Sequence, residues 1–193
     1  PLPMIYQSGY LTIKDYDRDI DMFLLDFPNN EVKSGFLTMV AANYFQNNES
    51  ADSWTKRTVV ALKRGETEKF RTLLTSFLAS IPYTARRKEN EREKERYFQY
   101  TFYLLLRLMS VYTVHLEMEQ SEGRVDCVVE TPKYVYIFEF KLDGTAAQAL
   151  RQIQEKGYAR PYLSDSRQVH LIGVNFSSAT GTVDGWECAD SIL

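Results

Sequence analysis

Residues 124–142 read RVDCVVETPKYVYIFEFKL, and this stretch decides how the C-terminal half of the chain folds. Two runs rich in β-branched and aromatic residues, 124–130 and 134–142, flank the turn residues Thr131 and Pro132. This pattern is typical of two strands joined by a short loop. The second run is apolar at most positions, as expected for a central strand that is buried on both faces. The stretch therefore predicts a β-hairpin within a sheet.

Two charged residues, Glu139 and Lys141, interrupt the second run near its end. An unpartnered charge is costly to bury, so these two side chains must pair, lie at the rim of the sheet, or bind a metal ion. Taken alone, the pair leaves a simple salt bridge at a strand end and a metal site equally open.

The expected hairpin brings a third charged residue to the same place. A loop at residues 131–134 places Asp126 directly opposite Glu139, and opposed residues share a face of the sheet. Lys141 lies on that face too, because side chains alternate with a period of two. Two neighbouring carboxylates repel each other unless a cation lies between them, and hard oxygen ligands suit Mg²⁺ or Mn²⁺. The sequence thus predicts that Asp126 and Glu139 bind a metal beside Lys141.

The flanking sequence predicts the rest of the sheet. A helix over 89–110 is amphipathic at first and then apolar, residues 113–120 alternate like a strand, and residues 168–176 form a further apolar run. Between the last two strands, Thr145 is expected to cap a helix that ends near Gly157. The order helix, three antiparallel strands, helix, strand predicts an α/β fold with one mixed sheet.

The N-terminal part has a different composition. Residues 1–27 predict a short hairpin, with strand-like runs on either side of the acidic turn at residues 15–21. Three helices should follow, over about 30–46, 53–64 and 66–80, the first capped by an asparagine and the second stopped by glycine.

The charged segment RRKENEREKER at residues 86–96 marks the expected boundary between two units. Its interleaved signs favour a solvated helix face with i,i+4 ion pairs, and a strip that faces DNA is the less favoured alternative. We therefore predict a small hairpin and helical module over 1–84, as the tail or linker of an upstream domain, and an α/β domain over 85–193.

Composition limits the function. The chain of 193 residues has a net charge of -3, which argues mildly against nucleic acid binding over the whole surface but not against a local basic patch. Two cysteines, Cys127 and Cys188, predict no disulfide framework and a reducing cytoplasmic location. His115 and His170 lie in strand-like segments and are expected to be structural. The sequence contains neither a GxxxxGK[ST] phosphate loop nor a GxSxG elbow.

Asp126, a turn, and then Glu139-Phe140-Lys141 on the next strand resemble the D…(D/E)-x-K signature of the PD-(D/E)XK nuclease superfamily. The resemblance implies a restriction-endonuclease-like core. It also implies that Asp126, Glu139 and the backbone carbonyl of Phe140 hold Mg²⁺ or Mn²⁺, while Lys141 assists the attacking water. The first motif has Val125 where the superfamily name has proline.

Longer phrases resemble one branch of that superfamily, found C-terminal to an AAA-type ATPase-like domain in bacterial proteins. They are YQSGYLTI at 6–13, VDCVVETPKYVYIFEFKL at 125–142 and QIQEKGYARPY at 152–162. The resemblance adds Gln152 to the expected site. Gln154 and Tyr158 have the Q-x-x-x-Y spacing of RecB-like members, and Glu95 is a less favoured extra acidic residue.

The sequence thus favours a cytoplasmic, magnesium-dependent nuclease that acts on nucleic acid, with DNA as the favoured substrate. It is expected to work with an upstream ATPase domain and not at a membrane. The alternative is a non-catalytic nucleic-acid-binding or regulatory module of an AAA-type ATPase. A purely structural interaction domain is a third and weaker hypothesis.

Overall fold

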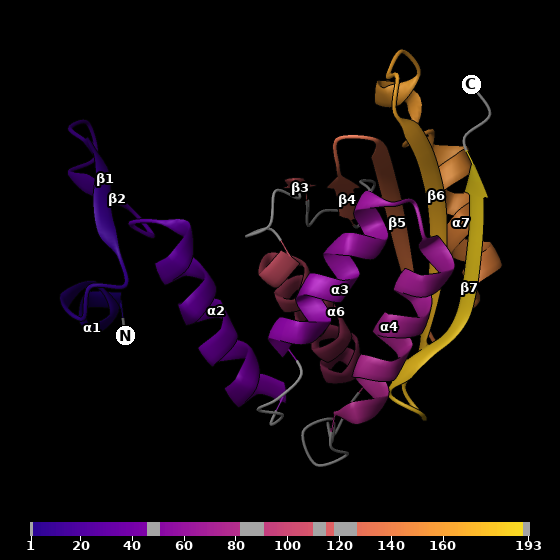
Figure 1. The fold of residues 1–193 in the computed structure, drawn as a ribbon, viewed down its shortest axis with the longest axis horizontal. Coiled ribbons are helices and arrows are strands. Elements are labelled where there is room, and N and C mark those ends of the chain that lie inside the picture. Colours follow the sequence, from indigo (N-terminus) through magenta and orange to yellow (C-terminus); the bar gives the residue numbers. More distant parts are fainter. Residues whose placement is uncertain (1, 46–50, 82–90, 110–114, 118–126, 191–193) are drawn as a thin grey trace.

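The computed structural model of the protein describes residues 2–45, 51–81, 91–109, 115–117 and 127–190. Its main body is built from ten helices and strands of those residues: α3 (Ala51–Lys63), α4 (Thr67–Ser80), α6 (Glu91–Met109), β3 (His115–Glu117), β4 (Cys127–Glu130), β5 (Tyr134–Leu142), α7 (Ala146–Lys156), the short 3-10 helix η2 (Arg160–Tyr162), β6 (Gln168–Ser177) and β7 (Thr182–Asp190). The strands form one sheet in the order β3-β4-β5-β6-β7. Helices α3, α4 and α6 cover one face of the sheet and α7 covers the other (Figure 1).

The predicted hairpin and its register are confirmed over the described residues. Strands β4 and β5 run antiparallel, with Cys127 opposite Phe138 and Glu130 opposite Val135. The turn is closed by the amide of Thr131, which donates to the carbonyl of Tyr134 at 2.8 Å. The predicted pairing of Asp126 with Glu139 lies outside the described residues.

Strand β6 runs parallel to β5, which gives the mixed sheet that was predicted. Parallel neighbours need a crossover connection, and α7 supplies it. Thr145 caps this helix in a capping box with Gln148, and Gly157 ends it in the left-handed conformation at φ +67°. Both ends of the helix were predicted from these residue types.

The largest apolar cluster lies between the sheet and α3, α4 and α6. Phe102 of α6 packs against Phe140 with ring centroids 4.3 Å apart, and Phe70 of α4 packs against Phe138. The hydroxyl of Tyr136 in β5 donates to the carbonyl of Leu62 in α3 at 2.5 Å, and burial raises the pKa of this phenol above its ordinary value.

This cluster joins residues on both sides of the predicted boundary between 84 and 85. The helices of the first predicted unit and the sheet of the second therefore share apolar contacts. The division into two units stays a prediction.

Strand β7 was not predicted from the sequence. It pairs antiparallel with β6 and forms an edge of the described sheet. Val183 is buried, whereas Asp184, Glu187 and Asp190 are exposed. An edge strand needs no continuous apolar run, so the signal in TVDGWECAD is weaker than in β5.

Residues 2–45 form an arm beside the main body (Figure 1). Its elements are α1 (Leu2–Gln7), β1 (Thr12–Asp17), β2 (Met22–Asp26) and α2 (Asn30–Phe45). The hairpin was predicted, but β1 continues through Asp17, which was expected in the turn, and α1 was not predicted. Asn29 caps α2 as expected, because its side-chain oxygen accepts from the amide of Val32.

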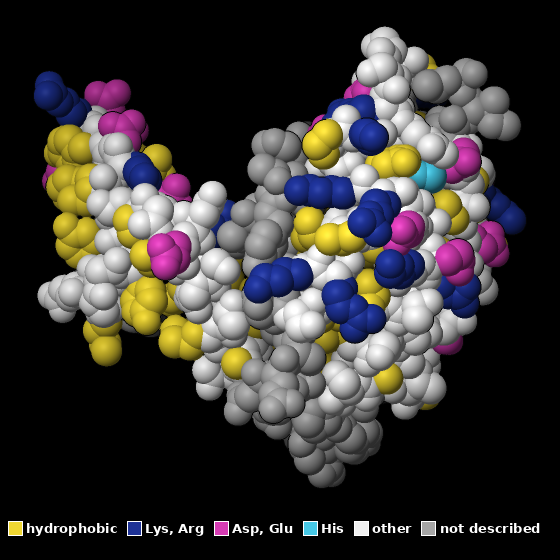
Figure 2. All heavy atoms as spheres, viewed as in Figure 1, with side chains coloured by type: hydrophobic (Ala, Val, Ile, Leu, Met, Phe, Trp, Pro, Cys, Tyr) yellow, Lys and Arg dark blue, Asp and Glu magenta, His cyan; other side chains and the backbone are white. Residues whose placement is uncertain are grey.

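The arm exposes apolar side chains (Figure 2). Four neighbours at the hairpin are between 58% and 62% exposed: Ile20, Met22, Phe23 and Leu24. Exposed apolar side chains in a contiguous group are typical of a surface that contacts another protein or domain. In the part of the chain that the structure describes, every helix is too short or too polar to cross a bilayer.

Gly173 sets how closely α7 approaches the sheet. A methyl group on this residue would stand 2.3 Å from the carbonyl oxygen of Ala146 and 2.6 Å from the amide nitrogen of Leu150. We expect Gly173→Ala to lower the free energy of unfolding by about 1–3 kcal/mol, because the backbone of α7 must move away. Urea denaturation measures the change.

The matched control is Gly35→Ala in α2, where nothing lies within 4 Å of the added methyl group. This variant should be as stable as the wild type or more stable, since alanine favours a helix by up to about 1 kcal/mol. A Gly173→Ala protein with unchanged stability would contradict the close packing of α7.

Candidate functional site

Glu139 and Lys141 lie near the end of β5, on the face of the sheet that α7 covers. Two residues earlier on the same face, Ile137 packs with Ile153 of α7. Glu139 is only 2% exposed, whereas the side chain of Lys141 is 32% exposed. The strand therefore carries a carboxylate into the interior and leaves an ammonium group partly in contact with solvent.

Gln152 of α7 links these two charged groups. Its side-chain nitrogen donates to Oε1 of Glu139, and its side-chain oxygen accepts from Nζ of Lys141 at 2.7 Å. The Nζ of Lys141 lies 3.6 Å from the same Oε1 of Glu139. Three of the predicted site residues, Glu139, Lys141 and Gln152, are therefore brought together.

The two partners define the orientation of the Gln152 amide. A carboxylate only accepts hydrogen bonds and an ammonium group only donates them, so a single orientation of the amide satisfies both. The carboxylate of Glu139 lies in a largely water-excluded place, where charge interactions are stronger than in bulk water, whereas Lys141 is partly exposed. The amide thus compensates for part of the hydration that the buried carboxylate has lost.

The position of Gln152 follows from the packing of α7. Ala149 and Ile153 are fully buried on the same helix, and α7 crosses the sheet directly above Gly173. Glu139 pairs with Gly173 across the parallel strands. Because glycine allows the helix to approach at this point, the side chain of Gln152 reaches the carboxylate of Glu139.

Other predicted residues have different positions. Gln154 is exposed on α7, and Tyr158 packs beside the apolar cluster between α7 and the sheet. The glutamine that contacts Glu139 is Gln152. The ring of Phe140 packs on the opposite face, against Phe102. The predicted role of Phe140 concerns its backbone carbonyl and stays a prediction.

The remaining predicted groups lie outside what the structure describes. Asp126 is outside the described residues, and so are the side chain of Glu95 and the side chains of the charged segment at 86–96. The predicted role of Asp126 as a metal ligand is therefore untested.

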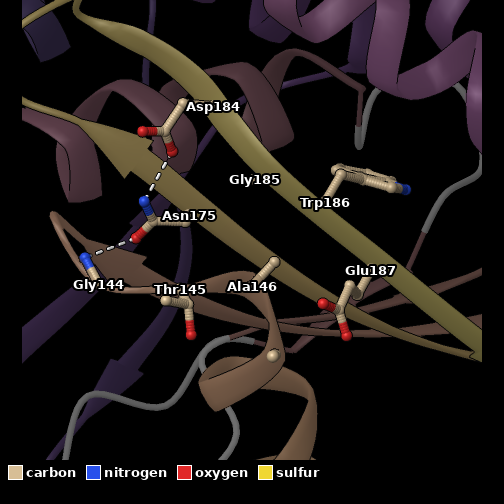
Figure 3. Close-up of a pocket in the computed structure, with 9 residues that line it drawn as sticks. Gly144, Thr145, Ala146, Asn175, Asp184, Gly185, Trp186 and Glu187 are labelled. Carbon is tan, nitrogen blue, oxygen red and sulfur yellow. Dashed lines mark hydrogen bonds between the residues drawn. The ribbon is translucent and has the colours of Figure 1, made fainter.

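A hollow of about 270 Å³ lies between the N-terminus of α7 and strands β6 and β7 (Figure 3). Asn175 organises it: the side-chain oxygen accepts from the amide of Gly144 at 2.9 Å, and the side-chain nitrogen donates to Asp184 at 2.6 Å. Asp184 and Glu187 bring two carboxylates to the lining. These residues were not predicted as site residues, and the only signal for them is the weak alternation in β7.

The donors at Glu139 are suitable for a hard divalent ion. A buried carboxylate near the end of a strand offers oxygen ligands, and the side chain of the neighbouring Lys141 is partly exposed to solvent. Mg²⁺ and Mn²⁺ prefer such oxygen ligands to nitrogen or sulfur. Of the donors that the resemblance implies, the structure describes the carboxylate of Glu139 and the backbone of Phe140, and both offer the oxygen atoms that such an ion prefers.

Part of the chain matches a known family. Residues 93–186, which include β5, α7 and β6, match the family model of the PD-(D/E)XK nuclease superfamily. This superfamily generally comprises nucleases that use divalent metals. The sheet with its flanking helices is a mixed α/β arrangement compatible with a restriction-endonuclease-like fold.

The chain is also similar to an uncharacterized protein in the vnfD 5′ region of Azotobacter chroococcum mcd 1. The two are 33% identical over 187 residues, which is 95% of this chain and 36% of the relative. The chain therefore spans little more than a third of the length of that relative. No solved structure matches this chain.

The ammonium group of Lys141 should stabilise the fold through Glu139. Replacing it by Lys141→Met keeps most of the apolar stem and removes the positive charge beside a buried carboxylate. We expect the free energy of unfolding to fall by about 1–3 kcal/mol, toward the low end because Lys141 is partly exposed. Chemical denaturation at neutral pH measures it.

Lys133→Met is the matched control, because Lys133 is exposed in the turn between β4 and β5. It should leave stability unchanged. Adding Glu139→Gln to Lys141→Met should recover part of the loss, since the double variant has no buried charge left. A double variant that is less stable than Lys141→Met would show that the charge pair is not the cause.

Proposed function

We propose that this protein is a metal-dependent nuclease that hydrolyses phosphodiester bonds of nucleic acid, with DNA as the favoured substrate. The observation that carries the proposal is the contact of Glu139, Lys141 and Gln152 at the end of β5, within a region that matches a nuclease superfamily. The charge pair alone is also expected of a structural salt bridge. The matched family model is what favours the nuclease.

In this proposal, Glu139, Asp126 and the backbone carbonyl of Phe140 hold Mg²⁺ or Mn²⁺. A divalent ion at such a site lowers the pKa of bound water and offsets the charge of the phosphate. All three protein donors are oxygen atoms, as such an ion prefers. The role of Asp126 rests on its place in the sequence, one residue before the described start of β4.

Lys141 and Gln152 have distinct roles in this proposal. The ammonium group of Lys141 positions the attacking water and stabilises the negative charge that develops on the phosphate oxygens. Gln152 is a positioning residue: it accepts from Nζ of Lys141 and donates to Glu139, so it holds both groups in one orientation before substrate binds. The partial exposure of Lys141 lets its ammonium group reach a phosphate at the surface.

Cleavage assays test the proposal. Purified protein with Mg²⁺ or Mn²⁺ should cleave DNA, and chelation of the metal by EDTA should stop the reaction. Glu139→Gln and Lys141→Met should each lower the rate at least about a hundredfold, since each removes charge stabilisation of the transition state. Lys133→Met should retain the wild-type rate. A well-folded, metal-loaded protein that is inert on single-stranded and double-stranded DNA and on RNA would contradict the proposal.

Metal binding is tested separately by calorimetric titration with Mn²⁺. We expect binding by the wild type and at least about tenfold weaker binding by Asp126→Asn and Glu139→Gln, because each variant loses one anionic ligand. Nucleic acid binding that survives Glu139→Gln and requires no metal would instead favour the non-catalytic binding or regulatory module.

We further propose that this chain works as part of a longer protein with an AAA-type ATPase domain. The sequence resemblance supports it, as do the length of the relative and the apolar side chains that the arm exposes. The check is the reading frame in which this chain is encoded: a GxxxxGK[ST] motif is expected before residue 1. An upstream sequence with no phosphate loop would contradict this proposal without affecting the nuclease site.

A further inference from the structure

A second group of metal-ligating side chains lies on the opposite face of the sheet from Glu139. His170 comes from β6, and Cys188 and Asp190 come from β7. The antiparallel register pairs His170 with Asp190 and Ile172 with Cys188. Positions 188 and 190 share a face because they are two apart, so the three side chains converge.

The ring of His170 identifies which face this is. It stacks on Tyr136, with ring centroids 5.2 Å apart, and the hydroxyl of Tyr136 in turn bonds to α3. Thr67 at the start of α4 hydrogen-bonds the thiol of Cys188. The cluster therefore lies where β6 and β7 meet the turn between α3 and α4, with the sheet between it and Glu139.

The donor atoms are close enough to share one ion. One nitrogen of His170, the sulfur of Cys188 and a carboxylate oxygen of Asp190 all lie within 4.8 Å of one another. Ligand atoms around one tetrahedral zinc ion are about 3.3–3.8 Å apart, given metal–ligand distances of about 2.0–2.3 Å. Cys188 and Asp190 are exposed, which leaves their side chains room to adjust around a shared ion.

The surroundings of His170 prepare it for ligation. Its Nδ1 lies 2.7 Å from Oδ1 of Asp190, and its side chain is only 8% exposed. The other ring nitrogen, Nε2, is buried and has no hydrogen-bond partner among the described residues. Because Nδ1 is the nitrogen that faces Asp190, it is the ring atom that an ion shared with Asp190 would contact, and the ion would replace the hydrogen bond between the two side chains.

The chemistry of the set indicates which ion it would take. A thiol, an imidazole and one carboxylate form a mixed sulfur, nitrogen and oxygen set that suits Zn²⁺ and not Mg²⁺. Burial, followed by the charge of Asp190, raises the pKa of the Cys188 thiol, whereas the bond from Thr67 lowers it. A divalent ion would reverse this effect, because metal-bound thiols lose their proton.

We propose that His170, Cys188 and Asp190 form a second metal site that binds Zn²⁺ with water as the fourth ligand. On binding, sulfur donates a lone pair to the ion and the thiol proton passes to solvent. The ion would join β6 to β7 beside the α3–α4 turn and stabilise the edge of the sheet. The site is independent of the proposed nuclease chemistry on the other face.

Cobalt(II) tests this proposal because it replaces zinc and absorbs visible light. The wild-type protein should show a thiolate-to-cobalt charge-transfer band and the strong visible bands of four-coordinate cobalt, and Zn²⁺ should abolish both by competition. Cys188→Ser should lose the charge-transfer band. His170→Gln and Asp190→Asn should weaken cobalt binding by at least about tenfold.

Two controls separate this site from other features of the chain. Cys127→Ala removes the other cysteine, which is buried in β4, and Glu139→Gln alters the proposed magnesium site. Both should keep the cobalt spectrum. Circular dichroism confirms that each variant is folded. Asp190→Asn is the variant least expected to disturb folding, because the side chain of Asp190 is 60% exposed.

The outcomes are distinct. A wild-type spectrum without a charge-transfer band would overturn the proposal, and so would a band that persists in Cys188→Ser. Unchanged cobalt affinity in both His170→Gln and Asp190→Asn would show that Cys188 binds cobalt without these two residues, and this result would also overturn the proposal. Because none of these readouts uses cleavage of nucleic acid, an inactive nuclease would leave the result intact.

Discussion

The burial of one carboxylate, that of Glu139, is the constraint on which the site depends. A central strand places this group where water is largely excluded, and a charge in such a place must be compensated by neighbouring groups. Lys141 supplies the opposite charge from the same strand, and Gln152 supplies a hydrogen bond from the helix above. The helix α7 therefore has to pack on the sheet in one position before the charge of Glu139 is fully compensated.

The position of α7 depends on a close contact with the backbone of the sheet. Gly173 lies between Glu139 and Glu187 across three strands, and α7 passes directly over it. The helix separates two regions of the same face, the Glu139 cluster on one side and the hollow at Asn175 on the other. The opposite face serves packing through aromatic rings, and there the cluster at His170 is a polar exception. A single sheet thus holds two chemically different groups, one based on oxygen and one that includes sulfur.

Much of the fold could be predicted from local signals. The continuous apolar run of β5, the cap at Thr145 and the stop at Gly157 define the central hairpin and α7, because each signal depends only on neighbouring residues. Strand β7 escaped prediction because an edge strand with one exposed face has few apolar residues. The helix α1 and the extension of β1 through Asp17 escaped for a similar reason, since polar residues there favour no single conformation strongly.

The sequence by itself determined which residues could do chemistry: Glu139 and Lys141 are two apart on one strand, and alternation places them on one face without further information. Only the tertiary structure decided that Gln152, and not Gln154, meets both of them, because that choice depends on how α7 rotates and how near it comes above Gly173. It likewise decided that His170, which the sequence indicated to be merely structural, lies beside Cys188 and Asp190. Contacts between residues far apart in the chain arise from strand pairing and helix packing, and no local pattern encodes either.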